Sequence, residues 1–380
     1  MAKKKVLIFI DWYLPGYKAG GPIQSVANLV EHLKDEFEFS IITRNTDYCE
    51  TTPYPHINSD AWNTLPNGVK VYYFSENELT HKNIRNLIRK TDYDCTYLNG
   101  IYSLYFTLIP LFYLRKKHHK TIVIAARGMF SEGSLSVKAT KKKFFIRAVK
   151  VLQFFDKVIF HTASEIEKHE IRKVLGNMVM IKTAGVLPQK SAIPVLVNRK
   201  KKSGYARIVN IARISPEKNT LYALQILKHC KQNIQFDFYG PVYDKEYFLL
   251  CQQAMAELPA NVVANYKGSV ESNHVINVLS DYEFMFMPTT GENFGHIILQ
   301  SFSVGCPVVI SDKTHWKHLQ EKKIGWEIPL NEITEFSKTI DTAAVMKQDE
   351  YNLMSRHAYD YAQHYINNPD LIEQNRHLFV

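Results

Sequence analysis

The sequence predicts an α/β protein with two doubly wound parallel sheets, both Rossmann-like, and three observations support this. Short apolar runs alternate with amphipathic segments along nearly the whole chain, as in parallel strands joined by helices. The alternation lapses between Pro188 and Gly204, around the basic run 199–202, and then starts again. A length of 380 residues also exceeds one ordinary core and suits two domains of roughly 190 residues each.

The first half begins with a predicted strand at Lys5 to Ile10. The loop that follows ends in Gly20-Gly21-Pro22 and leads to an amphipathic helix at 23–33, an order with which phosphate sites begin. It is neither a dinucleotide fingerprint nor a P-loop, because the required spacings are missing. Further strands are predicted at 39–43, 69–74, 96–98, 121–125, 158–160 and 179–181, and helices at 81–90, 101–117, 138–154 and 164–175.

The second half repeats this alternation. Strands are predicted at 208–211, 236–239, 262–266, 283–287 and 307–310, helices at 217–230, 245–257, 273–280 and 295–305, and a mostly helical remainder with an amphipathic stretch near 350–367. The predicted domains are 1–190 and 205–360, with a linker at 191–204 and a helical segment at 361–380 that crosses back to the first domain. A cleft between the two sheets is the expected ligand site.

The stretch Thr289 to Gln300 carries the clearest ligand signal. It places one acid, Glu292, between Gly291 and Gly295, after a buried strand and before an apolar helix. In open α/β sheets ligands bind beyond the carboxyl ends of strands, where glycine lets the backbone approach them. A plain turn in which Glu292 caps the helix is the alternative.

Two cations follow the first strand of the second half. Arg213 stands at its carboxyl end and Lys218 about one helical turn later. A guanidinium fork and an ammonium suit a diphosphate. Taken alone, this pair could simply be solvated side chains near a helix start. Glu292 is expected at the same edge of the sheet, and this favours a ligand site.

Charge is unevenly distributed along the chain. Residues 1–195 carry 28 Lys and Arg against 17 Asp and Glu, whereas residues 196–380 carry 19 against 20. All of the excess positive charge therefore lies in the first half, which favours an anionic partner, namely a membrane surface, a phosphate-bearing lipid or nucleic acid. A basic surface without a partner is the alternative. No recognisable module supports a nucleic-acid partner.

The stretch 138–155 is the candidate for membrane contact. Its lysines cluster at one end, and an apolar face is expected from Phe144, Phe145, Val149, Leu152 and Phe155, as in an interfacial helix. An ordinary sheet-packing helix with a solvated basic edge is the alternative.

A cytoplasmic location is expected. The five cysteines form no CxxC pair, which favours a reducing compartment and argues against a zinc knuckle. The longest apolar run, Tyr102 to Leu114, is interrupted by Pro110 and is too short to span a membrane. No secretory signal is expected, because Met1 to Lys5 leads directly into the first strand.

Five motifs stand in a familiar order along the chain. They are Gly20-Gly21, Ala126-Arg127-Gly128-Met129, Arg213 with Lys218, Tyr266-Lys267-Gly268-Ser269, and the segment from Gly291-Glu292-Asn293-Phe294-Gly295-His296 through Gly305 to Asp312. With these motifs the chain resembles a GT-B glycosyltransferase of family 4, the retaining enzymes, and more narrowly those of bacterial surface polysaccharide clusters.

The resemblance implies roles for these residues. The implied catalytic set is Glu292, Arg213, Lys218 and Arg127, and the implied donor-binding set is Gly20, Gly21, Gly268, Val270, Asn293, Phe294, Gly295 and Gln300. Arg213 and Lys218 would neutralise the donor diphosphate, and Glu292 would hold sugar hydroxyls with help from the following backbone N–H groups. Gly268 and Val270 would lie by the nucleobase, and Arg127 near the sugar, where many relatives have His.

Two positions depart from the family pattern. Gln300 stands where the family has a second acid, which accepts hydrogen bonds from the ribose hydroxyls. Because a neutral amide is a weaker acceptor than a carboxylate, weaker nucleotide affinity is expected. Thr183-Ala184-Gly185-Val186 replaces the usual Asn-Gly-Val. No Asp-x-Asp motif stands at a strand end, so transfer without a metal or other cofactor is expected.

The sequence thus predicts a hexosyltransferase that moves a sugar with retention from a nucleotide sugar to a glycan or lipid-linked acceptor in lipopolysaccharide or capsule synthesis. It is expected at the inner face of an anionic membrane as a peripheral protein. Another GT-B enzyme, such as a nucleotide-sugar epimerase or a phosphorylase, and a non-catalytic nucleotide-sugar-binding subunit remain alternatives. A front-face displacement is favoured over a double displacement through Glu292.

Overall fold

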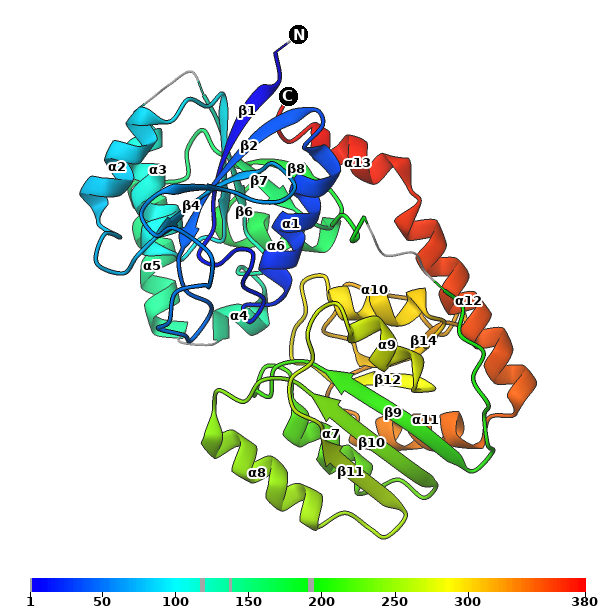
Figure 1. Ribbon diagram of the computed structural model, residues 1–380. Coiled ribbons are helices and arrows are strands. Elements are labelled where there is room, and N and C mark those ends of the chain that lie inside the picture. Colours follow the sequence, from blue (N-terminus) through cyan, green and yellow to red (C-terminus); the bar gives the residue numbers. More distant parts are fainter. Residues whose placement is uncertain (1, 117–119, 137–138, 191–194) are drawn as a thin grey trace. The chain divides into compact units, whose positions relative to one another are not determined.

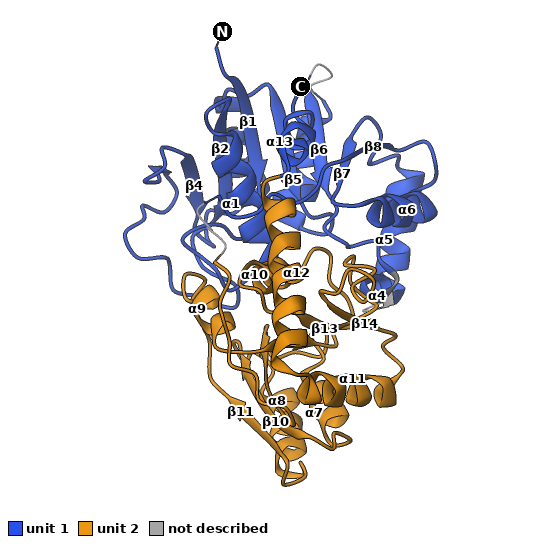
Figure 2. Cartoon of the chain, turned by 90° about the vertical axis from the view of Figure 1, so that its right-hand side faces the viewer, with its two compact units in different colours: residues 1–191, 368–380 blue, residues 192–367 orange. Residues whose placement is uncertain are grey.

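The computed structural model describes residues 2–116, 120–136, 139–190 and 195–380 (Figure 1). Lys138 of the predicted basic helix, residue 117 of another predicted helix and 191–194 of the predicted linker lie outside these ranges. The chain divides into two compact units, the first comprising 1–191 and 368–380 and the second 192–367 (Figure 2). Each unit contains one sheet.

The sheet of the first unit has eight strands in the order β3-β4-β2-β1-β5-β6-β7-β8. All neighbours are parallel except β3, which is antiparallel to β4. The strands are β1 (Lys4–Phe9), β2 (Phe37–Arg44), β3 (Trp62–Thr64), β4 (Lys70–Phe74), β5 (Cys95–Asn99), β6 (Thr121–Ala125), β7 (Ile159–Thr162) and β8 (Met180–Thr183).

Helices cover both faces of this sheet. They are α1 (Gly21–Leu33), α2 (His81–Lys90), the π-helical turn η1 (Leu104–Leu108), α3 (Ile109–Leu114), α4 (Glu132–Ser136), α5 (Ala139–Val151), α6 (Glu165–Leu175) and α13 (Pro369–Arg376). On one face Leu7 and Phe9 of β1 join a buried cluster with Ile84 of α2 and Leu111 of α3. On the other, the ring of Phe379, just after α13, lies 5.5 Å from that of Phe37.

The sheet of the second unit has six parallel strands in the order β11-β10-β9-β12-β13-β14. They are β9 (Tyr205–Ile211), β10 (Asn233–Tyr239), β11 (Val262–Tyr266), β12 (Phe284–Met287), β13 (Val308–Ser311) and β14 (Gly325–Ile328). The helices are α7 (Thr220–Leu227), α8 (Lys245–Ala256), α9 (Val275–Ser280), α10 (His296–Ser303), α11 (Ile333–Val345) and α12 (Gln348–Ile366).

One continuous core lies between this sheet and three of its helices. Alternate strand residues such as Phe236 and Phe286 pack there against α7, α8 and α11. α10 packs against α12, where Phe302 of α10 contacts Tyr361 of α12, with ring centroids 5.7 Å apart. The predicted doubly wound α/β fold with two parallel sheets is confirmed.

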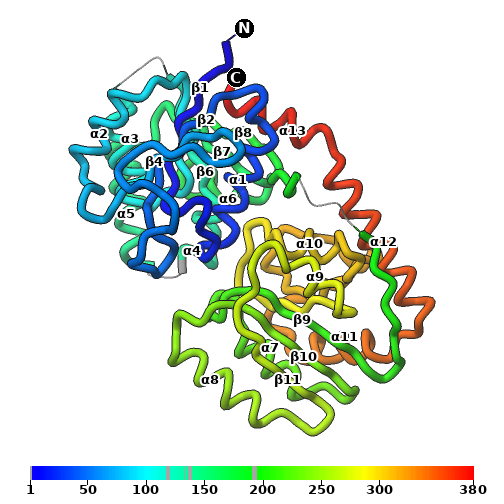
Figure 3. The backbone as a smooth tube through the Cα atoms, viewed as in Figure 1, coloured from blue at the N-terminus to red at the C-terminus, as the bar shows by residue number. Residues whose placement is uncertain are grey.

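The unit boundaries differ in detail from the predicted ones. Arg199, predicted to lie in the linker, is only 5% exposed and donates to the backbone carbonyls of Leu279 and Val304 in the second unit. The chain leaves the second unit after α12 and enters the first at α13, as its path in Figure 3 shows. β3 and β14 were not predicted, but apart from β14 the remainder after β13 is mostly helical, as predicted.

Among the described residues, no helix combines the length and apolar character that crossing a membrane requires.

Candidate active site

Three of the predicted site residues of the second unit, Arg213, Lys218 and Glu292, lie at the switch point of its sheet. The strand order reverses between β9 and β12, because β10 lies on the other side of β9 and β13 on the other side of β12. The loops leaving two such strands diverge and leave a crevice in which ligands bind in open α/β sheets. Arg213 and Lys218 lie in the loop after β9, and Glu292 lies in the loop after β12.

Lys218 and Glu292 form an ion pair across this switch point. The Lys218 Nζ donates to the Glu292 Oε2, and the two side chains are 16% and 19% exposed. Burial alone would raise the pKa of Glu292, but the positive charge of Lys218, with smaller contributions from His296 and Arg213, lowers it below its ordinary value. Glu292 is therefore ionised at neutral pH.

Backbone hydrogen bonds tie the two loops together. The carbonyl of Glu217, next to Lys218, accepts bonds from the Thr289 hydroxyl at 3.0 Å and the Thr290 N–H at 3.0 Å. The Asn219 side chain donates to the Pro288 carbonyl at 2.9 Å. Lys218 and Glu292 thus come from loops that hold each other.

Gly295 determines where Glu292 lies. Its φ of 72° is in the left-handed region, and a Cβ at this position would lie 2.9 Å from both the Glu292 Cγ and the Ile298 Cδ1. Gly295 is also the N-cap of α10 and has no side chain with which to cap it.

Aromatic side chains pack against each other within the loop that carries Glu292 and hold it in place. Phe294 is buried and stacks on His315, with ring centroids 5.2 Å apart. Its carbonyl accepts a hydrogen bond from the Trp316 indole at 2.5 Å. The Phe294 side chain therefore anchors the loop, and only its backbone is suited to the ligand contact that the sequence predicted. Asn293, its neighbour, is partly exposed.

The remaining predicted donor residues lie on the same sheet or close to it. Gln300 is partly exposed in the second turn of α10, one turn after His296. Gly268 and Val270 follow β11 and are partly exposed. The Gly268 carbonyl accepts a hydrogen bond from the Gly240 N–H at 2.8 Å.

Gly240 itself was missed by the sequence analysis. A Cβ there would lie 1.8 Å from the Ala212 carbonyl oxygen, beside Arg213, so only glycine fits. The strand end Tyr239-Gly240-Pro241 was the available signal.

The glycine loop of the first unit leaves the carboxyl end of β1. Gly20, with φ of 73°, is the N-cap of α1 and has no side chain with which to cap it. Both Gly20 and Gly21 are exposed. Asp47, which the sequence analysis missed, holds the loop. Its carboxylate accepts hydrogen bonds from the backbone N–H groups of Tyr17 at 2.9 Å and Lys18 at 3.1 Å.

Arg127 lies after β6 at the end of a chain of hydrogen bonds. Its Nη2 donates to the Tyr97 hydroxyl at 2.9 Å and its Nε to the Asn99 Oδ1 at 2.8 Å. The Tyr97 hydroxyl lies 2.8 Å from the His161 Nδ1, and the His161 Nε2 lies 2.9 Å from the Ala184 carbonyl. The Ala184 carbonyl only accepts, so the His161 Nε2 carries a proton, and in the neutral ring the Tyr97 hydroxyl donates to Nδ1.

Burial, with the nearby positive charge of Arg127, lowers the pKa of His161 to about 3, in agreement with this neutral state. Sequence analysis missed Tyr97 and His161, which stand among the apolar residues of β5 and β7. The feature of the sequence that could have indicated them is a polar side chain within an otherwise apolar strand.

The predicted apolar face of the basic helix is only partly right. Phe144 and Leu152 are exposed, as expected, but Val149 and Phe155 are buried, and Phe145 packs on Tyr102 with ring centroids 5.2 Å apart. Val151, which was not predicted, is exposed as well.

In the described ranges, no three His, Cys, Asp or Glu side chains are grouped so that they could hold a metal ion. Metal-independent transfer stays a prediction.

Comparison with known proteins places the second unit in a family. Residues 196–361 match the model of the family described as glycosyl transferases group 1. No curated protein sequence matches the chain.

Among solved structures, the sucrose-phosphate synthase (tll1590) from Thermosynechococcus elongatus superposes with a TM-score of 0.73 at 14% identity, over 100% of this chain and 98% of that one. Alr3699/HepE of Anabaena, solved with UDP and glucose, gives 0.70 at 13%, over 99% and 98%. WaaG, a glycosyltransferase involved in lipopolysaccharide biosynthesis, gives 0.66 at 11%, over 98% of each chain.

At such identities the likeness establishes the fold, which is GT-B. Residues 196–361 are a group 1 glycosyltransferase domain, and the protein is an enzyme of the glycosyltransferase class.

Proposed function

We propose that this glycosyltransferase moves a sugar, with retention of configuration, from a nucleoside diphosphate donor to a glycan or lipid-linked acceptor in surface polysaccharide synthesis. The observation that carries the proposal is the Lys218–Glu292 pair at the switch point of the second sheet, with Arg213 in the same loop as Lys218. It puts cations for a diphosphate next to an ionised acceptor for sugar hydroxyls.

The residues divide the work by charge. Arg213 and Lys218 stabilise the negative charge that develops on the departing diphosphate, an electrostatic effect worth several kcal/mol in a site that excludes water. Glu292, held ionised by Lys218, accepts hydrogen bonds from donor-sugar hydroxyls. Lys218 can bond a diphosphate without leaving Glu292, because its ammonium has three N–H donors and Glu292 accepts one of them.

Retention is proposed through a front-face displacement. The bond between the anomeric carbon and the phosphate oxygen breaks while the acceptor oxygen bonds to the same face of that carbon. The acceptor proton moves to the departing phosphate oxygen, so no protein base is required. Trapping a glycosyl adduct on Glu292, detected by mass spectrometry, would replace this mechanism by double displacement.

The neighbours support the choice of donor and pathway without assigning them. HepE was solved with UDP-glucose, and WaaG acts in lipopolysaccharide biosynthesis. Sucrose-phosphate and trehalose-phosphate synthases have a similar fold. By analogy with them, the competing hypothesis is that the acceptor is a small soluble molecule. Membership of family 4 is part of the same proposal.

The test begins with a melting-temperature screen against nucleotides and nucleotide sugars. A donor at 100 times its Kd stabilises the folded protein by about 2.7 kcal/mol. With the donor in hand, Glu292→Ala is expected to reduce transfer about 10²- to 10³-fold without lowering the melting temperature by more than a few degrees. Glu321→Ala, which removes an exposed acid of the same unit, is the control and should transfer normally. No response to any nucleotide, or full turnover by Glu292→Ala, contradicts the proposal.

Contact with an anionic membrane is proposed for α5 in a revised form. Phe144 and Val151 are both 76% exposed, and the cations Lys143, Arg147 and Lys150 are exposed on the same helix. An apolar stripe beside cations suits the boundary of anionic lipid headgroups. We expect vesicles rich in phosphatidylglycerol to co-sediment the protein at low salt and the variant Phe144→Ser/Val151→Ser much less. Equal sedimentation of the two proteins would exclude this helix.

A further inference from the structure

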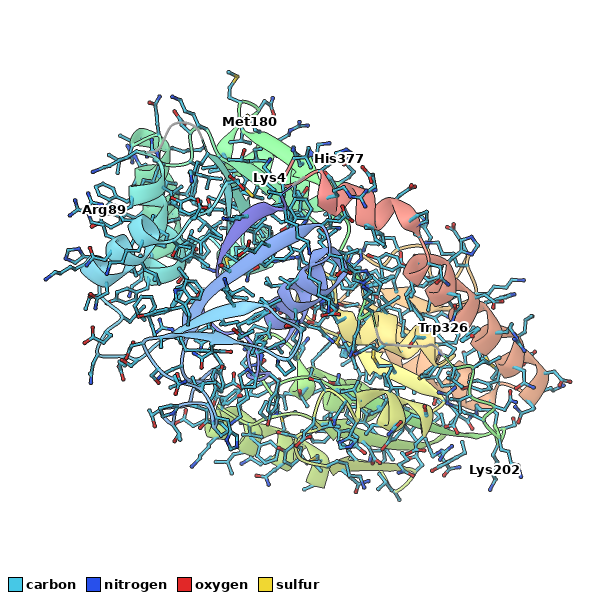
Figure 4. All side chains as sticks on the ribbon, turned by 45° about the horizontal axis from the view of Figure 1, so that its top comes forward. Lys4, Arg89, Met180, Lys202, Trp326 and His377 are labelled. Atoms are coloured by element: carbon cyan, nitrogen blue, oxygen red, sulfur yellow. The ribbon has the colours of Figure 1, made fainter. Side chains whose placement is uncertain are left out.

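The end of the chain, residues 368–379, is built into the first unit although it follows the last helix of the second. His377 marks this chain end in Figure 4. The side chains of Leu378 and Phe379 are both 0% exposed, and burial of such large apolar groups favours the docked state. The chain end is therefore part of the packed interior of the first unit.

The Phe379 ring packs against the Tyr97 ring, with centroids 5.9 Å apart, and against the Phe39 ring, at 6.0 Å. Tyr97 is itself completely buried, and its ring also meets that of His161, with centroids 5.9 Å apart. Protein interiors are close-packed, so the neighbours of a buried ring determine its orientation. Phe379 thus helps to set the direction in which the Tyr97 hydroxyl points.

The helix α13 bonds to the backbone where the chain of hydrogen bonds through Tyr97 ends. The Gln374 Oε1 accepts the Gly185 N–H at 3.1 Å, and the Asn375 Nδ2 donates to the Gly185 carbonyl at 2.8 Å. The preceding carbonyl, of Ala184, is the one that lies 2.9 Å from the His161 Nε2. The chain end therefore holds both the ring and the terminal carbonyl of this chain of hydrogen bonds.

Arg127 depends on support of this kind. Its φ of 53° is in the left-handed region, which is unfavourable for a non-glycine residue and persists only where the surrounding structure holds it. Asn99 and Tyr97 accept one hydrogen bond each from its Nε and Nη2. Its remaining N–H donors have no hydrogen-bond partner in the described residues, and the side chain is partly exposed. Two side chains thus direct a guanidinium that keeps donors for a ligand.

We propose that the chain end, residues 368–379, positions Arg127 for the transfer reaction, through the Phe379 ring on Tyr97 and through the α13 side chains that hold Gly185. Phe379 is a positioning residue, because it acts on Arg127 through Tyr97. The consequence for catalysis rests on the proposed function, since it takes Arg127 as a residue beside the donor sugar. The consequence for the Arg127 side chain itself does not.

The Arg127 Nε–H group reports on this positioning without any substrate. Two-dimensional ¹⁵N–¹H spectra of the full-length protein show arginine Nε–H groups that are protected by hydrogen bonds, and Arg127→Lys assigns this signal. In Phe379→Ala we expect the Arg127 Nε–H to exchange with solvent at least about tenfold faster, the factor that a loss of 1.4 kcal/mol in local stability gives. Phe379→Leu keeps apolar bulk and should fall between Phe379→Ala and wild type.

Leu371→Ala is the matched control. Leu371 is a buried apolar residue of α13, 6% exposed, so its truncation also weakens the docking of the chain end. It is expected to lower the melting temperature and to leave the exchange of the Arg127 Nε–H near the wild-type rate. Asn375→Ala removes the bond to the Gly185 carbonyl and should accelerate that exchange severalfold.

The second measurement is transfer itself, once the donor is identified. Phe379→Ala is expected to lower kcat and kcat/KM by the same factor, at least about fivefold, as for a contact made only in the transition state. Leu371→Ala should keep the wild-type kcat. Phe379→Leu should recover most of the loss, because it restores packing on Tyr97.

Three results would overturn the proposal. One is wild-type exchange of the Arg127 Nε–H in both Phe379 variants. Another is equal acceleration by Phe379→Ala and Leu371→Ala, which would reduce the effect to general loosening. The third is faster exchange with unchanged kcat, which would remove Arg127 from the reaction and leave the proposed donor site at Glu292 untouched. If no donor is found, the proposed function fails, and the exchange rates still decide whether the chain end positions Arg127.

Discussion

The two sheet edges of this protein hold their charges in different ways. On the second sheet Lys218 and Glu292 are paired directly, in loops joined through the Glu217 carbonyl. On the first sheet Arg127 is held by neutral groups, of which Tyr97 belongs to a chain of hydrogen bonds that ends on a backbone carbonyl. An ion pair holds its members in place but partly cancels their charge, whereas neutral partners position a cation and leave its charge to a ligand.

The difference predicts two kinds of binding. A diphosphate at the second edge meets a lysine whose positive charge Glu292 partly cancels, so binding there gains less from that cation. At the first edge, Arg127 has no acid among its hydrogen-bond partners in the described residues, although the buried Glu167 lies near enough to interact with its charge. Substitutions that act on one edge and not on the other separate the two cases.

The largest effect is expected from a matched pair of glycines at the second edge. Gly295→Ala introduces a Cβ 2.9 Å from the Glu292 Cγ at a left-handed φ, which is expected to destabilise the unit by about 1–3 kcal/mol and to displace Glu292. Gly291→Ala meets nothing within 4 Å and should be almost neutral. Denaturant unfolding and donor affinity measure both variants, and equal behaviour of the two would contradict the role given to Gly295.

At the first edge, Tyr97→Phe removes one hydroxyl and leaves the Arg127 Nη2 and the His161 Nδ1 without it. Loss of a partner for buried polar groups is expected to lower the free energy of unfolding by about 2 kcal/mol. The control is Tyr13→Phe, because the Tyr13 hydroxyl is buried without a hydrogen-bond partner in the described ranges. Chemical denaturation should therefore give a lower free energy of unfolding for Tyr97→Phe than for Tyr13→Phe. Equal stability of the two variants would contradict the chain of hydrogen bonds through Tyr97.

Each unit also has a histidine near its edge, of which His161 is buried and His315 is half-buried. Burial lowers the pKa of His161 to about 3 and that of His315 to about 4. The unfolded chain takes up a proton as the pH falls below about 6.5, whereas the folded histidines stay neutral. Stability is therefore present above that pH and declines as the pH falls.

Each histidine is expected to reduce the free energy of unfolding of its unit by about 2 kcal/mol between pH 7 and pH 5. Unfolding curves at the two pH values, with His161→Gln and His315→Gln, measure this. Each variant should lose part of the pH dependence in its own unit, and a slope unchanged in both variants would refute the assignment.

The smallest effect is expected at Gln300. Gln300→Glu restores a charged acceptor in α10 and should tighten nucleotide binding by about 1 kcal/mol, or roughly fivefold. Gln252→Glu, on the exposed side of α8, adds the same charge elsewhere and should change nothing. Calorimetric titration distinguishes them, and weaker binding by Gln300→Glu would show that the position does not face the nucleotide.

Much of the fold was predictable because buried strands have a distinct pattern. The predicted strands 121–125 and 262–266 coincide with β6 and β11. β14 was missed because its sequence, Gly-Trp-Glu-Ile, lacks an apolar run. The glycine in this strand is required by a contact with the neighbouring strand β13, because a Cβ at Gly325 would lie 2.2 Å from the Val308 carbonyl oxygen.

The candidate site divides in the same way. Lys218 and Glu292 were predictable because each follows a recognisable strand in a loop with glycine or proline nearby. Tyr97 and His161 were not, because within β5 and β7 they read as strand residues. Their meeting depends on the order of strands in the sheet, which periodicity does not supply. The face of α5 was misjudged because its partners are distant in sequence.

The central claim is that a nucleoside diphosphate binds at the Lys218–Glu292 switch point, and calorimetry with Lys218→Met tests it most directly. The titrant is the nucleoside diphosphate that raises the melting temperature most, and Lys202→Met, an exposed lysine of the same unit (Figure 4), is the control. The account predicts at least about tenfold weaker binding by Lys218→Met and normal binding by Lys202→Met. Wild-type affinity in a folded Lys218→Met protein would contradict it.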